Sequence, residues 1–240
     1  MRIEPYGVDS IVHIVKRGAR GTKITRDVID QERFARLLFY LNDEYQDRGN
    51  HGWENEVRTL QPFERPSYWP ERVPLVRILA WVLMPNHFHL ILQEIKENGM
   101  SKFMQRLGGS MSMHFNAKYN EQGSIFQGSF RSRTIDTDAY LRYCAAYVMV
   151  KNPFELAPGG LVKAITHFDD AWRWALAYPH SSLPVYGAHT ASPIIETEAN
   201  ILKELFHTSL VFKTAAHDMF LAHIQHRDNE VFDTLLLEKW

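Results

Sequence analysis

Two histidines, His87 and His89, are separated by a single residue in the apolar segment LMPNHFHLIL, residues 83–92. Side chains at positions i and i+2 of a β-strand point to the same face, so both imidazoles share one face of a strand here. A neutral imidazole nitrogen is the commonest metal ligand, and two on one strand need only one or two further ligands to hold a divalent ion. The spacing alone fits two hydrogen-bonded surface histidines equally well.

The composition is that of an ordinary globular protein, with 45% hydrophobic and 23% charged residues among 240. That length allows one main domain plus an extension. The net charge of −1 gives no overall attraction to a polyanion, so a nucleic-acid site would have to appear as local basic clusters. The single cysteine, Cys144, excludes an internal disulfide framework and a thiolate zinc cluster.

The ends and the apolar runs of the chain indicate where the protein resides. Residues 1–10 lack a basic-then-apolar signal pattern. No apolar run reaches the roughly 20 residues that span a bilayer. Together with the single cysteine, these features predict a cytoplasmic protein with no membrane partner.

The first half of the chain predicts a strand, a helix and a hairpin. Residues 7–17 are rich in β-branched side chains and lead into a basic loop that contains glycine. Asp30 is the expected N-cap of a helix whose apolar positions run from 34 to 45. Residues 46–74 lack periodicity and are expected to form a long connecting loop. Residues 75–83 and 87–93 are apolar runs joined by a turn at 84–86, as in an antiparallel hairpin.

The second half predicts mainly helices. The apolar stripe over 101–119 indicates a helix despite Gly108 and Gly109, and a short strand is expected before residue 135. Thr137 is the expected cap of a third helix, which Pro153 should end near Asn152. The composition changes after residue 160, so residues 1–160 are expected to form the main domain. Residues 161–240 are then a mostly helical extension, with helices near 167–177 and 196–226.

This order of elements indicates an α+β fold with helices on one face of an antiparallel sheet and the other face free. His87 and His89 are expected on the free face. The third helix carries Tyr147 in the segment YVMVKNP. A metal that polarises the target of this tyrosine would make it a nucleophile, but a tyrosine on an apolar helical stripe is usually a core residue. Tyr140 and Tyr143 are open to the same alternative.

Four segments of the chain resemble, in order and spacing, the single-tyrosine HUH transposases, and specifically their REP-associated branch. These segments are VHIVKRGARG, ILAWVLMPNHFHLIL, GSIFQGSFRSR and YLRYCAAYVMVKNPFEL, and the similarity covers roughly residues 8–160. The pattern MPNHFHL, then FQ, then F-R, then a tyrosine before NP is far more specific than H-x-H alone.

The resemblance implies a ferredoxin-like or RRM-like fold and an enzyme that cleaves and joins single-stranded DNA through a 5′-phosphotyrosine. It implies that His87 and His89 hold a divalent metal, Mg²⁺ or Mn²⁺, and that Tyr147 is the nucleophile, with Tyr143 as the alternative. The implied partner is single-stranded DNA that carries a hairpin, and a homodimer is compatible with it. Residues 1–160 would then be the transposase-like catalytic domain.

The chain departs from this family at one position. The family usually has Asn or Gln four residues after the tyrosine, where its amide oxygen reaches the same metal. Here Lys151 stands at +4 and Asn152 at +5. On an α-helix position +4 lies about 40° from the tyrosine and position +5 about 140°. Either a one-residue π-bulge brings Asn152 back as a metal ligand, or Lys151 takes its place and the enzyme is impaired or relies on water.

Two local basic clusters are candidates for binding DNA phosphates. One follows the first strand and the other spans the second predicted helix and the strand after it. Solvated charged faces are the ordinary alternative. The candidate residues are Lys16, Arg17, Arg20, Lys102, Arg106, Arg131 and Arg133.

Two other functions stay open at this point. A domesticated hairpin-DNA or RNA binder would keep the scaffold and the basic clusters without cleavage. A metal-dependent phosphodiesterase would use His87 and His89 with water as the nucleophile. Only the transposase reaction leaves DNA covalently bound to the protein.

Overall fold

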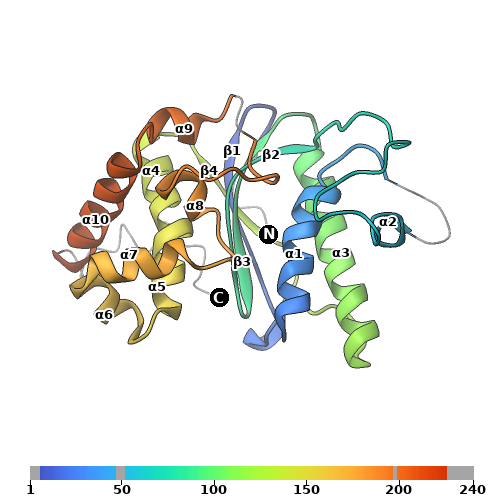
Figure 1. Cartoon of the computed structure of the whole chain (residues 1–240), viewed down its shortest axis with the longest axis horizontal. Coiled ribbons are helices and arrows are strands. Elements are labelled where there is room, and N and C mark those ends of the chain that lie inside the picture. The colour runs from blue at the N-terminus through green and yellow to red at the C-terminus, as the bar shows by residue number, and fades with distance from the viewer. Residues whose placement is uncertain (1–5, 47–51, 197–198, 226–240) are drawn as a thin grey trace.

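A four-stranded antiparallel sheet forms the centre of the computed structural model, which describes residues 6–46, 52–196 and 199–225 (Figure 1). The strands are β1 (Ile11–Arg17), β2 (Val76–Met84), β3 (His87–Glu94) and β4 (Arg131–Ile135), in the order β2-β3-β1-β4. Helix α1 (Val28–Tyr40) connects β1 to β2, and α3 (Gly99–Tyr119) connects β3 to β4. This is the β-α-β-β-α-β arrangement of a ferredoxin-like fold, so the predicted fold class is confirmed.

Helices α1 and α3 cover one face of the sheet (Figure 1). The ring of Phe34 in α1 lies 5.1 Å from that of Phe88 and 6.1 Å from that of Trp81. Helix α3 runs unbroken through its two glycines. A Cβ atom on Gly108 would lie 3.1 Å from Cε of Lys16, so this glycine leaves space for a lysine that passes beneath the helix.

Helix α1 begins earlier than the sequence predicted. Its N-cap is Asp27, whose carboxylate accepts a hydrogen bond from the backbone N–H of Asp30 at 3.0 Å. The prediction of Asp30 as the N-cap was therefore wrong. Asp30 is buried and accepts hydrogen bonds from Lys118 and Tyr119 of α3, so its carboxylate ties the two helices together.

The opposite face of the sheet is covered too, by α4 (Asp138–Ala146), the π-helical turn η2 (Tyr147–Lys151) and α5 (Asn152–Leu156) (Figure 1). The prediction that this face is free was wrong. Residues 147–150 are all buried, because one side of this helical stretch packs on the sheet while α4 also packs against α10. A helix that is apolar on several sides needs partners on several sides.

Pro153 does not end this helical stretch, contrary to the prediction. The chain continues as α5, and Pro153 occupies its first turn. Pro153 comes just after the π-helical turn Tyr147–Lys151, where the regular i→i−4 hydrogen-bond pattern is already interrupted, so its missing N–H does not break a regular α-helical turn.

The remaining elements lie around these layers: η1 (Ala19–Gly21), α2 (Gly52–Glu56), α6 (Gly160–Thr166), α7 (Phe168–Leu176), α8 (Leu183–Gly187), α9 (Ile201–Leu205) and α10 (Ser209–Gln225). Part of the loop predicted at 46–74 lies outside the described residues, and α2 interrupts the rest. The segment before α8 pairs with the edge strand β2, since Leu83 donates to the carbonyl of His180 and Ser182 donates to that of Trp81, both at 2.9 Å. Within the described ranges no helix is long and apolar enough to cross a membrane.

Candidate active site

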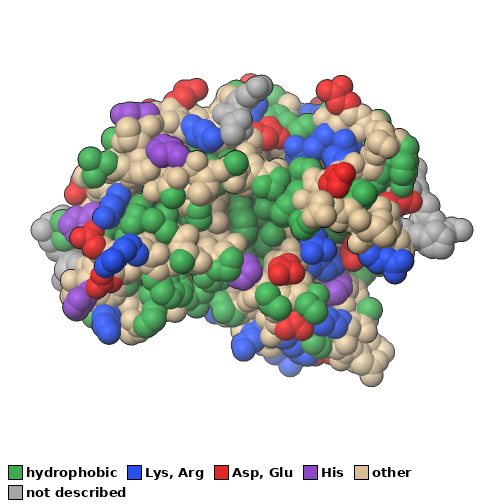
Figure 2. All heavy atoms as spheres, viewed as in Figure 1, with side chains coloured by type: hydrophobic (Ala, Val, Ile, Leu, Met, Phe, Trp, Pro, Cys, Tyr) green, Lys and Arg blue, Asp and Glu red, His purple; other side chains and the backbone are tan. Residues whose placement is uncertain are grey.

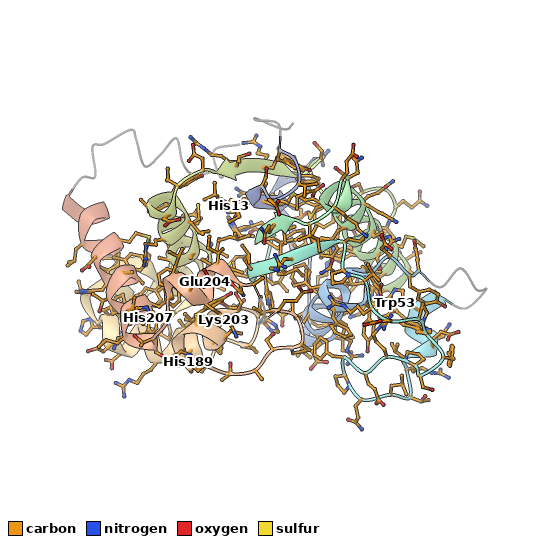
Figure 3. All side chains as sticks on the ribbon, turned by 90° about the horizontal axis from the view of Figure 1, so that it is seen from above. His13, Trp53, His189, Lys203, Glu204 and His207 are labelled. Atoms are coloured by element: carbon orange, nitrogen blue, oxygen red, sulfur yellow. The ribbon has the colours of Figure 1, made fainter. Side chains whose placement is uncertain are left out.

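The strand register places three histidines on one face of the sheet. Val15 of β1 pairs with His89 of β3, and His13 pairs with Ile91. Residues directly opposite each other in an antiparallel pair share a face, and so do residues two apart on one strand. His13, His87 and His89 therefore face the same way, toward η2. His13 is 1% exposed and His89 is fully buried. Figure 3 places His13 on the side of the sheet that faces α4, away from Trp53 and α2.

Each of the two H-x-H rings has a hydrogen-bond partner at Nδ1. Nδ1 of His87 lies 2.7 Å from Oδ1 of Asn86, and the Asn86 amide group is oriented by donating to the carbonyl of Gly21 at 3.3 Å. Nδ1 of His89 lies 3.0 Å from Nε2 of His13. The two rings meet edge to face with centres 4.9 Å apart. In both histidines Nε2 is thus the nitrogen that can act as a ligand.

The ring of Tyr147 lies over this histidine face. Its centre is 5.6 Å from that of His89 and 6.1 Å from that of His13. Tyr143 stacks on Tyr147 at 6.3 Å. Tyr147 is 3% exposed, so in this conformation the candidate nucleophile lies beneath the surface.

The helix widens by one residue between Tyr147 and Asn152. Residues Tyr147–Lys151 form a π-helical turn, and the backbone N–H of Asn152 donates to the carbonyl of Tyr147, five residues before it. The π-bulge predicted as one of two alternatives is thus confirmed. The Asn152 side chain donates from Nδ2 to the same carbonyl at 3.1 Å. Its Oδ1 is buried and has no hydrogen-bond partner among the described residues.

Lys151 contacts the nucleophile candidate directly. Its Nζ donates to Oη of Tyr147 at 3.3 Å and lies 4.7 Å from the centre of the tyrosine ring. Glu155, one helical turn later, holds the same ammonium group at 2.7 Å. The residue at +4 therefore does not replace Asn152; it places a cation beside the tyrosine hydroxyl.

Histidine side chains alone do not complete a site for a divalent ion here, and oxygen ligands would be needed as well. In the described part of the chain no three His, Cys, Asp or Glu side chains are grouped to hold a metal. A buried amide oxygen without a partner, such as Oδ1 of Asn152, is costly by about 1–3 kcal/mol unless something binds it. Two imidazoles and one amide oxygen would form a mixed set that leaves the remaining positions of a divalent ion to water or phosphate.

Three of the seven candidate DNA-binding residues lie on the histidine face. Arg131 pairs with Val15 and Arg133 with His13 across the β1–β4 ladder, while Arg17 pairs with His87. The guanidinium of Arg133 lies 5.6 Å from the ring of Tyr140. These arginines flank the site from β1 and the edge strand β4.

The other candidates lie elsewhere. Lys16 faces α3, is buried and donates to the carbonyl of Gly128 at 2.9 Å; burial lowers its pKa. Arg106 donates to the carbonyl of Asp43 at 2.5 Å, and Lys102 is exposed on the same helix, across the sheet from the histidines. Arg20 is exposed in η1, with a left-handed backbone at φ 56°.

Sequence reasoning missed His13 and Asn86. The only signal for His13 is a histidine inside the apolar run IVHIVKR, and its relation to His89 depends on a register that the sequence does not state. Asn86 was assigned to the turn, where asparagine is common for conformational reasons. Its contact with the His87 ring is visible only in the structure.

Basic and acidic side chains are intermixed around an apolar centre on the face shown in Figure 2, as the net charge of −1 suggests. An attraction to phosphate must therefore arise locally, as at the three arginines beside the histidines. This arrangement differs from a surface that is basic throughout.

Part of the chain is similar to known proteins. Residues 74–151, a third of the 240-residue chain, match the family model described as "Transposase IS200 like". Curated protein sequences give no match. Among solved structures the chain is similar to a REP-associated tyrosine transposase bound to a REP hairpin, at 14% identity and a TM-score of 0.40, over 82% of this chain and 94% of that one. The segment that matches the family model contains His87, His89 and Tyr147.

Proposed function

We propose that this protein cleaves and rejoins single-stranded DNA through a covalent 5′-phosphotyrosine at Tyr147. The observation that carries the proposal is the π-helical turn between Tyr147 and Asn152. A regular α-helix would turn Asn152 away from the face that Tyr147 presents, whereas the wider turn brings the two residues closer to a common face. π-Bulges cost stability and concentrate at functional sites.

The reaction is an in-line displacement at phosphorus. Oη of Tyr147 forms a bond to the phosphorus, the bond from phosphorus to the 3′ oxygen breaks, and the phenol loses a proton while the 3′ oxygen gains one. The products are a 5′-phosphotyrosine and a free 3′-hydroxyl. A second 3′-hydroxyl reverses the step and joins strands without ATP, since the phosphodiester energy stays in the covalent link.

His87, His89 and Asn152 are the residues that would hold Mg²⁺ or Mn²⁺. Such an ion, when bound, polarises the phosphate and stabilises the negative charge of the transition state. The remaining chemistry belongs to the chain. Tyr147 supplies the attacking oxygen, and Lys151 supplies a cation 3.3 Å from that oxygen. Arg17, Arg131 and Arg133 lie on the same face as the histidines, where they can bind the strand on either side of the cleaved phosphate.

The proposed substrate is single-stranded DNA next to a hairpin, because a buried helix-borne tyrosine can reach a backbone only where the strand is not paired. The 3% exposure of Tyr147 adds a requirement, since the phosphate can meet the hydroxyl only after the π-helical turn or its surroundings move. The proposed catalytic domain is residues 1–160. A homodimer is a separate prediction, and sedimentation of the DNA complex tests it.

Covalent trapping tests the proposed function. The protein is incubated with Mn²⁺ and end-labelled single-stranded DNA that carries a hairpin, denatured, and resolved by electrophoresis. We expect label at the mass of protein plus DNA, lost with a chelator and absent with fully duplex DNA. Cleaved DNA without an adduct would favour the water-using phosphodiesterase. Binding without cleavage would favour a domesticated hairpin-binding module.

A further inference from the structure

A buried histidine outside the H-x-H pair contacts the site. His13 comes from β1, two residues before the partner of His89 in the ladder. Its Nε2 lies 3.0 Å from Nδ1 of His89, and both side chains are at most 1% exposed. The rings are stacked with centres 5.2 Å apart and planes 17° apart. The two backbones belong to paired neighbouring strands, β1 and β3.

We propose that His13 is a positioning residue that fixes the tautomer and the ring orientation of His89. This inference rests on the proposed function, in which His89 is a metal ligand. One proton is shared between Nε2 of His13 and Nδ1 of His89. If His89 supplies it, Nε2 of His89 keeps its lone pair for a metal. If His13 supplies it, Nε2 of His89 carries the proton and cannot bind a metal.

His87, the other histidine of the H-x-H pair, also has a hydrogen-bond partner at Nδ1, but this partner is an amide oxygen. Nδ1 of His87 donates to Oδ1 of Asn86, an atom that can only accept. The donation of Asn86 Nδ2 to the Gly21 carbonyl keeps that oxygen turned toward the ring. Both H-x-H rings are thus held at Nδ1 and present Nε2. Acceptors of this kind orient metal-binding histidines, and their removal typically costs about 10–100-fold in metal affinity.

His13 differs from Asn86 in one respect. A histidine accepts at Nε2 only as the tautomer that carries its proton on Nδ1. His89 therefore imposes a tautomer on His13 while His13 imposes one on His89. Glutamine at position 13 can supply an acceptor oxygen near the place of Nε2, whereas leucine fills similar space with no acceptor. This pair of substitutions separates the hydrogen bond from packing.

The first test reads tautomers without metal. Long-range ¹H–¹⁵N correlation spectra of the full chain, labelled in histidine, distinguish a protonated Nδ1 from a protonated Nε2. We expect His89 to be protonated at Nδ1 in the wild type and in His13→Gln, and to shift toward Nε2 protonation in His13→Leu. An unchanged His89 tautomer in His13→Leu would overturn the inference, whether or not the protein binds metal.

The second test reads metal affinity, with Mn²⁺ titrations followed by electron paramagnetic resonance. His13→Leu should bind Mn²⁺ about 10–100-fold more weakly than the wild type, and His13→Gln within a few-fold of it. His180→Leu, at a half-buried histidine beside β2, is the matched control and should not change the affinity.

Equal Mn²⁺ affinity in His13→Leu and the wild type would overturn the inference. So would loss of one Mn²⁺-coupled nitrogen in His13→Gln, because His13 would then be a ligand itself. A wild type that binds no Mn²⁺ but shows the expected tautomers would contradict the proposed function and leave His13 in its positioning role.

Discussion

The ring of Tyr147 meets that of His89 edge to face, and its hydroxyl accepts a hydrogen bond from the ammonium of Lys151. In the proposed reaction the phenolic oxygen attacks phosphorus during cleavage and leaves it during rejoining, so it carries partial negative charge in both steps. A nearby cation stabilises that charge in either direction. The contact between Lys151 and Glu155 keeps the ammonium in place while the DNA is absent.

Tyr147→Phe should abolish the covalent protein–DNA adduct, while Tyr143→Phe and Tyr140→Phe should retain it. Loss of one hydroxyl hardly changes the packing, so this change isolates nucleophilicity from stability, whereas alanine would open a cavity. The measurement is the labelled adduct on a denaturing gel, with thermal unfolding to confirm equal stability. Loss of the adduct in Tyr143→Phe alone would identify Tyr143 as the nucleophile.

Lys151→Met should slow adduct formation by about 10²-fold, the lower end of the cost of losing one charge-stabilising donor, and leave DNA affinity nearly unchanged. Methionine keeps the length of the side chain and its packing on the tyrosine ring. Single-turnover kinetics with saturating DNA measure the effect. Glu155→Gln, which removes only the anchor, should have a smaller effect. Wild-type kinetics in Lys151→Met would mean that its contact with Tyr147 is only structural.

Spacing pointed to His87 and His89, and the resemblance to the HUH transposases pointed to Tyr147; the structure places the ring of Tyr147 against the histidine face of the sheet. His13 escaped notice because its meaning depends on pairing between strands that are 70 residues or more apart in the chain. Lys16 illustrates the reverse case. It belongs to a basic cluster in the sequence, but the alternation of β1 sends it under α3 to the Gly128 carbonyl. Successive side chains of a strand point to opposite faces, so the position of a lysine in the strand decides which face it reaches. A count of charges does not include this information.

At the scale of elements, α1 and α3 are joined by one buried carboxylate. Burial alone would raise the pKa of Asp30, but hydrogen bonds from Lys118, the backbone of Arg26, Tyr119 and His114 outweigh it and lower the pKa to about 2. The unfolded value is near 3.9. A carboxylate with a depressed folded pKa adds stability above its unfolded pKa and loses it as the pH falls toward the folded pKa.

Asp30→Asn should therefore lower the free energy of unfolding by about 2 kcal/mol at pH 7, and by progressively less as the pH falls from about 5 toward 2. Urea unfolding of both proteins across this range measures the difference. Asp218→Asn, at an exposed aspartate of α10, is the control for the loss of one surface carboxylate and should leave the free energy of unfolding nearly unchanged at pH 7. A constant difference between wild type and Asp30→Asn over the whole range would contradict the assignment.

The strand β4 supplies a second prediction at this scale. Arg131→Gln with Arg133→Gln should weaken binding to single-stranded DNA, and should reduce the slope of log affinity against log salt by about 0.7 for each phosphate that an arginine no longer neutralises. Lys102→Gln is the matched control, because Lys102 lies on α3 across the sheet. An equal weakening in both variants would mean that the basic clusters act only through overall charge.

Periodicity was enough to locate the hairpin and the long helix α3, since a period of two or 3.6 over many residues is a strong signal. The residues at which helices begin were harder to predict from local sequence. Thr137 caps α4 as predicted, with its side chain accepting from Tyr140. At α1 the sequence predicted Asp30 as the cap, but Asp27 caps the helix and Asp30 instead contacts α3. Such a choice depends on tertiary contacts and is invisible in the local sequence.

At the scale of the whole molecule, residues beyond 160 complete the sheet. They pair with β2 through the segment before α8, and Tyr178 and Tyr186 donate to the carbonyls of Leu83 and Leu79. An edge strand with open hydrogen-bonding groups is prone to pair with other chains, and this segment covers it. The outer side of α4 is covered by α10 in the same way.

A chain that ends at residue 160 should therefore be less stable and more prone to aggregate than the full chain. The removed part covers the β2 edge and an apolar helix face. Thermal unfolding and light scattering of both proteins provide the comparison. A soluble 1–160 fragment that unfolds cooperatively would instead support the proposed division into a catalytic domain and a separate extension.

The composition change after Gly160 signalled a new part of the chain, but it carried no information on where that part would pack. The apolar stripe of α4 is visible in the sequence, but the contact of α4 with α10 is not. A single sequence shows which residues are apolar. It does not show which surfaces they meet, because those pairings depend on contacts between segments far apart in the chain.

The π-helical turn also bears on how this chain can be compared with others. One extra residue in a regular helix rotates everything after it by about 100°. Here the surplus is absorbed within Tyr147–Lys151, so α5 and the segments after it can keep the orientation that a chain one residue shorter would give them. An alignment that forbids gaps in helices would place Lys151 at the position where the resemblance leads one to expect Asn or Gln. It would then miss Asn152 as the candidate metal ligand. In the proposed site, the π-helical turn lets an asparagine five residues after the tyrosine take the place of an amide four residues after it.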